Sequence, residues 1–248
     1  GTILLSIYSM FGLGEYAYWY QQPTYFVYGA LWYGLTSILF FILKPTLPLQ
    51  DKLSQIFEEI SALLQAKARL FDPDNKENVE QLLFKLSLQN TQVAQSLNQI
   101  RSSLLTRLKA SRVSNKSIYW LNLYFFARDI HEQATSNYLH YEHIQQNFSR
   151  SDLIFRFQKN LRLQAQACHD LAQCILHNQQ YQSSQESQIG LNHLESSLKD
   201  WIQQHPQNFE VKNLKLIFNN LKGMHEQFEQ LQYAQPEPNY LQIVLLCK

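Results

Sequence analysis

The residues best suited to chemistry are concentrated in one stretch, RDIHEQATSNYLHYEH, at positions 128–143. His140 and His143 are three residues apart, so on a helix they would share one side and could ligate a metal ion. A di-metal site in a helical bundle uses Glu-x-x-His on at least two helices, and no histidine of the chain has a glutamate three residues before it. His131 instead falls between alanines at helical spacing, which favours a hydrogen-bonded core histidine. Asp129 and His131 therefore remain candidate motif residues, and no metal site is predicted.

A second group of charges, at the start of the next helical pattern, could form a basic face for lipid head groups. The alternative is an ordinary solvated face, because aspartates are interspersed with these cations. The group consists of Arg150, Arg156, Lys159 and Arg162. The chain contains no glycine loop for phosphate, no nucleophile elbow and no His-Glu-x-x-His motif. We therefore predict no catalytic residue, no cofactor and no enzymatic activity, with a di-metal or haem helical enzyme as an alternative.

Apolar residues recur every three or four positions through most of the chain, which predicts an all-α protein. We expect residues 46–233 to form a bundle of about six long helices. The second apolar stripe alternates spacings of four and three, as in helices that pack nearly parallel, and Asn90 in this stripe is expected to fix the register. The first two stripes are Leu53, Ile56, Ile60, Leu63, Ala66 and Leu70, and then Val79, Leu83, Leu86, Asn90, Val93, Leu97, Ile100 and Leu104.

Four further helices are expected after these two. The third helix should cover residues 114–148 and the fourth 151–177, followed by a loop at 178–188. Two shorter helices should carry the stripes that run from Leu191 to Trp201 and from Val211 to Leu231. Residues 234–248 are expected to form a linker or tail.

The first 45 residues differ in composition from this bundle, because positions 16–43 carry no charge. About twenty apolar or aromatic residues at 24–43 would make roughly 30 Å of helix, the thickness of a bilayer core. Residues 1–14 are interpreted as the end of another spanning helix. The sequence thus predicts one to two transmembrane helices in a membrane segment at 1–45, with a buried hairpin of a soluble protein as the alternative.

Aromatic residues mark the predicted membrane segment. Trp19, in the connector, is typical of a membrane interface, and Trp32 and Tyr33 could stack on an aromatic substrate or contact lipid. Positive charges begin at Lys44, which places the bundle on the cytoplasmic side by the positive-inside rule. The formal net charge of +1 gives no reason to expect nucleic acid as a partner.

Several motifs in this order resemble the YccS/YhfK branch of the fusaric-acid-resistance-like family of inner-membrane proteins, which includes exporters of aromatic carboxylic acids. The motifs are AKARLFDPD at 66–74, SLLTRL at 103–108, ARDIHEQATS at 127–136, SDLIFRFQ at 151–158 and QACHDLAQCIL at 166–176. The resemblance implies a bacterial inner-membrane protein of which this chain is an internal fragment. It implies no catalytic residues.

Two functions follow as hypotheses. The first is a transporter that exports small aromatic organic acids, in which the helical domain regulates or assembles the machine. The second is a membrane-anchored scaffold whose helices form homo-oligomers or bind a partner without transport. Either way the expected partners are the lipid bilayer, the remaining transmembrane helices of the parent chain and further copies of it.

Overall fold

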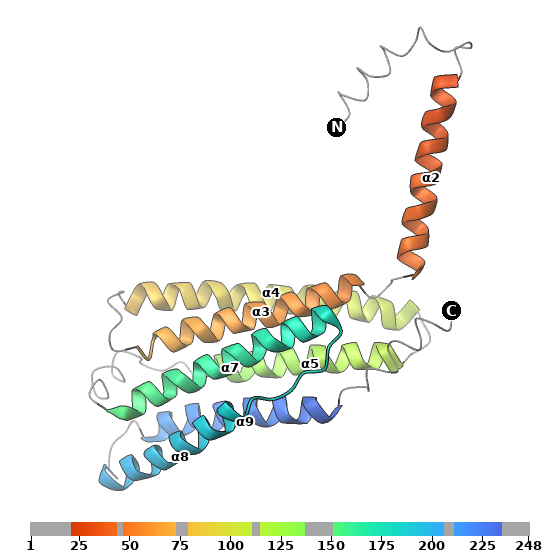
Figure 1. Ribbon diagram of the computed structural model, residues 1–248. Coiled ribbons are helices and arrows are strands. Elements are labelled where there is room, and N and C mark those ends of the chain that lie inside the picture. The colour runs from red at the N-terminus through yellow and green to blue at the C-terminus, as the bar shows by residue number, and fades with distance from the viewer. Residues whose placement is uncertain are drawn as a thin grey trace. The chain divides into compact units, whose positions relative to one another are not determined.

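The computed structural model describes residues 21–43, 47–72, 79–110, 115–136, 151–205 and 211–234 (Figure 1). Within these ranges the regular structure is entirely helical and contains no strand, which confirms the predicted all-α class. The chain divides into two compact units, Gly1–Pro48 and Leu49–Lys248. The three segments predicted from the sequence, 1–45, 46–233 and 234–248, stay predictions.

Helix α2 (Gln21–Leu43) is the described part of the first unit. The uncharged run of the sequence forms this helix, and the hydroxyl of Thr36 donates to the carbonyl oxygens of Trp32 and Tyr33 at 3.0 and 2.9 Å. In the described ranges, no helix combines the length with the apolarity that a bilayer crossing requires. The spanning role predicted for 24–43 is therefore not confirmed, and the predicted partial span at 1–14 lies outside the described residues.

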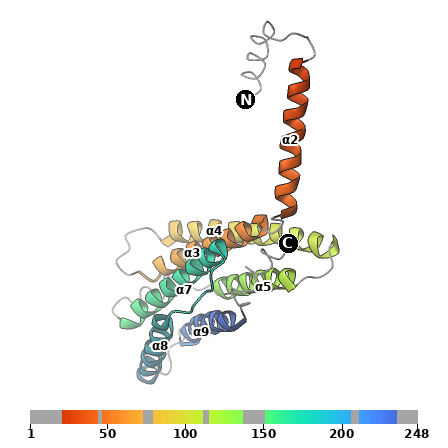
Figure 2. The same cartoon turned by 45° about the vertical axis from the view of Figure 1, so that its right-hand side comes forward.

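The second unit contains six helices in its described part, in line with the predicted bundle. Contacts join them in the order α4, α3, α7, α8, α9, α5 and back to α4, and α7 also packs against α9 (Figures 1 and 2). Helices α3 and α7 are antiparallel, because Gln50 near the start of α3 donates to the carbonyl oxygen of Ile175 near the end of α7. Helices α8 and α9 are antiparallel too, because Gln188 near the start of α8 contacts His225 in the second half of α9. The helices are α3 (Leu47–Arg69), α4 (Val79–Ala110), α5 (Asn115–Thr135), α7 (Asp152–His177), α8 (Gln185–Gln204) and α9 (Val211–Ala234).

Helix α7 shows most clearly how the apolar pattern positions an element. Every residue of its predicted stripe is buried in the core. The helix begins after Ser151, whose hydroxyl accepts from the backbone N–H of Leu153 at 3.2 Å. It ends at Asn178, which adopts the left-handed conformation that asparagine tolerates, with φ of 54°. The stripe consists of Ile154, Phe157, Leu161, Gln164, Cys168, Leu171 and Ile175.

Three details of the predicted helices are wrong. The loop expected at 178–188 is shorter, because Ser184 caps the N-terminus of α8, which begins at Gln185. In α4 the buried residue of the first turn is Leu82, and Leu83 is 37% exposed. A helical residue turns about 100° from its neighbour, so a one-residue shift in register moves a side chain out of the core.

The third of these details concerns α3. Lys67 is 4% exposed and occupies the stripe position expected for Ala66, which is only half-buried. Lys67 follows Leu63 by four residues and precedes Leu70 by three, so its spacing fits the stripe as well as that of Ala66 does. Alanine is the more hydrophobic of the two residues, so the sequence predicted that Ala66 would be buried. Lys67 is buried instead because its Nζ donates to the carbonyl oxygen of Ala134.

Candidate functional site

The aromatic residues predicted for a substrate path or interface lie in the first unit. Trp32 and Tyr33, on α2, are 69% and 75% exposed. Trp19 lies outside the described residues. In the described part of α2, Trp32 and Tyr33 therefore do not line an enclosed pocket within their own unit. Their predicted role stays a prediction.

His131 and Asn90 are joined by a hydrogen bond across the interface of α5 and α4. The distance between His131 Nε2 and Asn90 Oδ1 is 2.7 Å. An amide oxygen can only accept, so the imidazole carries its proton on Nε2. The two polar residues that the sequence placed in separate apolar stripes thus meet each other. This contact supplies the hydrogen bond expected of His131 and the register contact expected of Asn90.

The surroundings of His131 favour its neutral form. Burial lowers the pKa of His131 from its usual value, and the nearby Glu132 carboxylate raises it by a smaller amount. The imidazole is therefore mainly neutral at pH 7. Permanent positive charge in this region comes from arginine.

A groove of about 490 Å³ runs along the interface of α4 and α5, and His131 is one of the residues that line it. Two arginines, Arg101 and Arg128, also line it, together with Asn98. The rest of the wall is mostly apolar, and no carboxylate lines the groove. The apolar and aromatic residues are Ala94, Leu97, Leu104, Leu105, Leu121, Tyr124 and Phe125.

Asp129, the other candidate residue of positions 128–143, does not line the groove itself but forms an ion pair with Arg128, which does. Its Oδ1 accepts from Nε and Nη2 of Arg128 at 3.2 and 3.0 Å. The Arg128 guanidinium also lies 5.4 Å from the ring centroid of Phe125, within range of a cation–π contact. Asp129 and Phe125 together hold Arg128 at the groove. The structure thus brings His131 and the partner of Asp129 to one site.

Arg156 lies on α7, and the groove between α4 and α5 does not include it. Its Nε donates to Oδ2 of Asp152 one turn earlier at 2.6 Å. Arg162 approaches Asp72 at 3.6 Å. The cations of the predicted basic face are therefore partly paired with carboxylates, and Arg150 lies outside the described residues. This arrangement matches the solvated-face alternative more closely than a dedicated lipid site.

Lys67 is a buried charge that sequence reasoning missed. Its Nζ donates to the carbonyl oxygen of Ala134 at 2.6 Å. Ala134 lies in the last turn of α5, whose carbonyl groups have no partner within the helix and carry the negative end of the helix dipole. Burial lowers the pKa of Lys67 to about 8. A lysine at a stripe position was the signal that could have revealed this contact.

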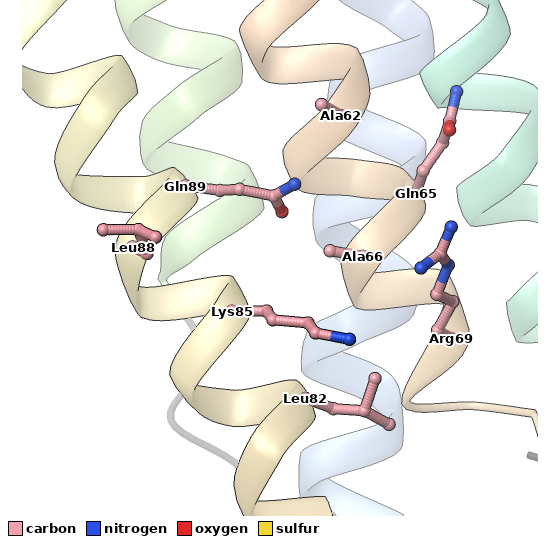
Figure 3. A pocket seen from close by; sticks show the side chains of 8 residues that line it. All are labelled: Ala62, Gln65, Ala66, Arg69, Leu82, Lys85, Leu88 and Gln89. Atoms are coloured by element: carbon pink, nitrogen blue, oxygen red, sulfur yellow. The ribbon is translucent and has the colours of Figure 1, made fainter. Parts of the chain in front are cut away.

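A smaller pocket of about 220 Å³ lies between α3 and α4 (Figure 3). Lys85 and Gln89 extend from α4 towards α3, where Gln65 and Arg69 form the other part of the wall. Two cations therefore share this pocket, but it is less than half the size of the groove between α4 and α5. Among the described residues, no group of three or more potential metal ligands forms. His140 and His143 lie outside those residues.

Comparison with known proteins gives consistent matches along the chain. A family model described as "FUSC-like inner membrane protein yccS" matches residues 1–228. The chain is 35% identical over 237 residues to the "Inner membrane protein YccS" of Escherichia coli (strain K12), which covers 96% of the chain and 33% of that protein. It is 26% identical over 233 residues to a protein of Haemophilus influenzae, which covers 93% of the chain and 32% of that protein. No solved structure matches.

The chain thus spans about a third of the length of the curated relatives it matches. The family model covers the uncharged N-terminal segment and nearly all of the helical bundle. These matches include the residues of the groove between α4 and α5. The chain therefore belongs to the FUSC-like family of inner-membrane proteins.

Proposed function

We propose that this chain is part of a bacterial inner-membrane transporter that exports small organic acids, aromatic acids among them, and that its helical bundle regulates or assembles the transporter. The observation that carries this proposal is the family match over residues 1–228. The absence of catalytic motifs in the sequence agrees with a transport role without enzymatic chemistry.

In this proposal residues 1–45 form the membrane segment, with α2 crossing or lining the bilayer. Large apolar side chains around α2 are solvent-exposed in its described part, for example Phe26 at 46% and Leu31 at 64%. Such a surface is costly in water and requires lipid or other apolar helices to cover it. The bundle would then lie on the cytoplasmic side, following the lysines that begin at Lys44.

Transport would be tested with the full-length parent protein in inverted membrane vesicles, using a panel of aromatic and aliphatic carboxylic acids. We expect saturable, selective movement that is lost when residues 46–233 are deleted, with the amount of protein in the membrane matched. Movement no greater than in empty vesicles, with the protein present, would reject transport.

Membrane placement would be tested separately with an impermeant maleimide in the same vesicles. A cysteine at Gln203, exposed on α8, should react from outside, because inverted vesicles display the cytoplasmic face. A cysteine at Tyr33 should be protected until detergent is added. Rapid labelling of the Tyr33 position in intact vesicles would contradict the placement of α2 in the bilayer.

A membrane-anchored scaffold is the second candidate, and the N-terminal half of α4 favours it. Phe84 and Leu88, one turn apart, are 72% and 62% exposed, so two large apolar side chains share one side of this helix. If the parent protein forms homo-oligomers through this face, Phe84→Glu with Leu88→Glu should dissociate them. Phe155→Glu, on α7, is the matched control. Dissociation with intact transport would assign the face to assembly alone.

A further inference from the structure

The groove between α4 and α5 has hydrogen-bonding, cationic and aliphatic residues along its length. The hydrogen bond from His131 to Asn90 fixes how these antiparallel helices align. Arg128 is about one turn from His131, and Leu121 lies about two turns further in the same direction. On α4, Arg101 lies between Leu97 and Leu104, so the backbones of Arg101 and Arg128 are about two turns apart along the groove. Their side chains lean towards each other, because side chains on a helix tilt towards the N-terminus of that helix and the two helices are antiparallel. The aliphatic residues Leu104, Leu105 and Leu121 follow at one end.

The charges of the groove are suited to an anion. No carboxylate lines the groove, and Arg101 has no ion-pair partner in the part of the chain that the structure describes. Arg128 contacts Asp129 only through Nε and Nη2, so further N–H groups of its guanidinium remain for a ligand. Two guanidinium groups can bind one carboxylate with charge-assisted hydrogen bonds.

The dimensions favour an elongated ligand. Along α4 the groove extends from Ala94 to Leu105, which at 1.5 Å per residue is roughly 16 Å. Its volume of about 490 Å³ lies within the range of small-molecule sites. A single aromatic ring would fill only part of this length. A straight alkyl chain could follow the aliphatic wall from Leu97 to Leu105.

We propose that the groove between α4 and α5 binds a medium-chain alkyl carboxylate, with its carboxylate at Arg101 and Arg128 and its alkyl chain along Leu104, Leu105 and Leu121. This site lies in the helical bundle and does not depend on the proposed transport activity. His131 and Asn98 also line the groove, and these neutral side chains can donate or accept hydrogen bonds without opposing an anion. The bundle would thereby respond to an amphipathic acid.

Hydrogen exchange of the full-length parent protein in lipid nanodiscs, read by mass spectrometry, would test this site. The probe is sodium decanoate, and decanol is the control for partition of the same alkyl chain into lipid. Sodium acetate is the control for the carboxylate alone. We expect decanoate to slow exchange in α4 and α5, with decanol and acetate giving little protection at the same concentrations.

Two kinds of variant test the binding of the carboxylate and of the alkyl chain separately. Arg101→Gln with Arg128→Gln should weaken decanoate binding about tenfold or more, because charge-assisted hydrogen bonds are lost. Leu105→Trp, at a residue that is 49% exposed, should fill the apolar end and block binding while the fold is retained. Lys159→Gln, on the exposed side of α7, is the matched charge control and should bind as the parent does.

The outcomes are distinct. Protection by decanoate that the arginine variant and Leu105→Trp abolish, and that Lys159→Gln retains, would support the site. Equal protection by decanol and decanoate, or unchanged binding in the double arginine variant, would overturn it. A failure here would leave the vesicle transport experiment unaffected, since that experiment reads movement across the membrane.

Discussion

Asn160 on α7 and Gly190 on α8 are in such close contact that the glycine has no room for a side chain. Asn160 Nδ2 donates to the carbonyl oxygen of Gly190 at 3.1 Å and to that of Arg156 at 2.9 Å. A Cβ at position 190 would lie 2.9 Å from Asn160 Oδ1 and 3.1 Å from a methyl group of Leu163. The asparagine is buried and held by two hydrogen bonds, so it cannot move aside without losing them.

Gly190→Ala should therefore lower the free energy of unfolding by about 1 kcal/mol, since lost hydrogen bonds outweigh the gain in helix propensity. Gly223→Ala is the matched control, because the three atoms nearest to its Cβ would all belong to the amide end of the half-buried Gln133, the first at 3.2 Å. This variant should be neutral or slightly more stable. Urea unfolding followed by circular dichroism would measure both. An alanine at 190 that is as well tolerated as one at 223 would refute the close approach.

The hydrogen bond between Asn90 and His131 can be measured with a double-mutant cycle. We expect Asn90→Leu and His131→Leu each to destabilise the protein by about 1 kcal/mol, because each leaves the other polar group without its partner. The double variant should lose less than the sum, with a coupling of about 0.5–1 kcal/mol. Additive losses would indicate that the two side chains do not interact in solution.

Lys67 should make the stability depend on pH in the alkaline range. Its pKa is lowered to about 8 by burial, whereas an unfolded lysine titrates near 10.5. Between these values the unfolded state binds more protons, so the free energy of unfolding rises with pH from about 8 to 10.5. Lys67→Met should remove this rise while also losing the contact with Ala134 O.

The difference between the unfolding curves of the parent and the Lys67→Met variant isolates this effect from tyrosine titration in the same range. The contribution of Lys67 should reach roughly 3.4 kcal/mol, because its pKa lies near 8 in the fold and at 10.5 in the unfolded chain and each pH unit between them adds about 1.36 kcal/mol. A difference that does not change between pH 8 and 10.5 would show that Lys67 is not desolvated.

His225 should contribute to a loss of stability in mild acid. Its Nε2 contacts Gln188 Oε1 at 2.6 Å, and burial lowers its pKa below 6.5 despite the opposing charges of Glu229 and Glu226. A histidine with a lowered pKa resists protonation in the fold, so stability falls as the pH drops through 6.5 towards the folded pKa. His225→Gln should flatten this fall relative to the parent, as measured by thermal unfolding between pH 7 and 5. An equally steep fall in the variant would assign the acid sensitivity elsewhere.

Local patterning was enough to predict the helices of the bundle. The stripe of α7 is buried from Ile154 to Ile175 as its spacing predicts, since a sustained period of 3.6 residues leaves one face for the core. The apolar spacing does not predict which helices pack against each other. That α5 packs against both α4 and α9 depends on contacts between segments far apart in sequence, and periodicity carries no information on them.

The spacing of residues in the sequence indicated that Asn90 and His131 would be polar residues in apolar stripes, and the sequence itself determined that residues 16–43 carry no charge. Only the tertiary structure decided that Asn90 and His131 face each other, and that Arg101 and Arg128 share a groove. The same holds for Lys67, whose burial depends on the carbonyl end of α5 lying beside it. A buried charge needs a partner, and the identity of that partner is set by packing between helices rather than by the residues next to it in the chain.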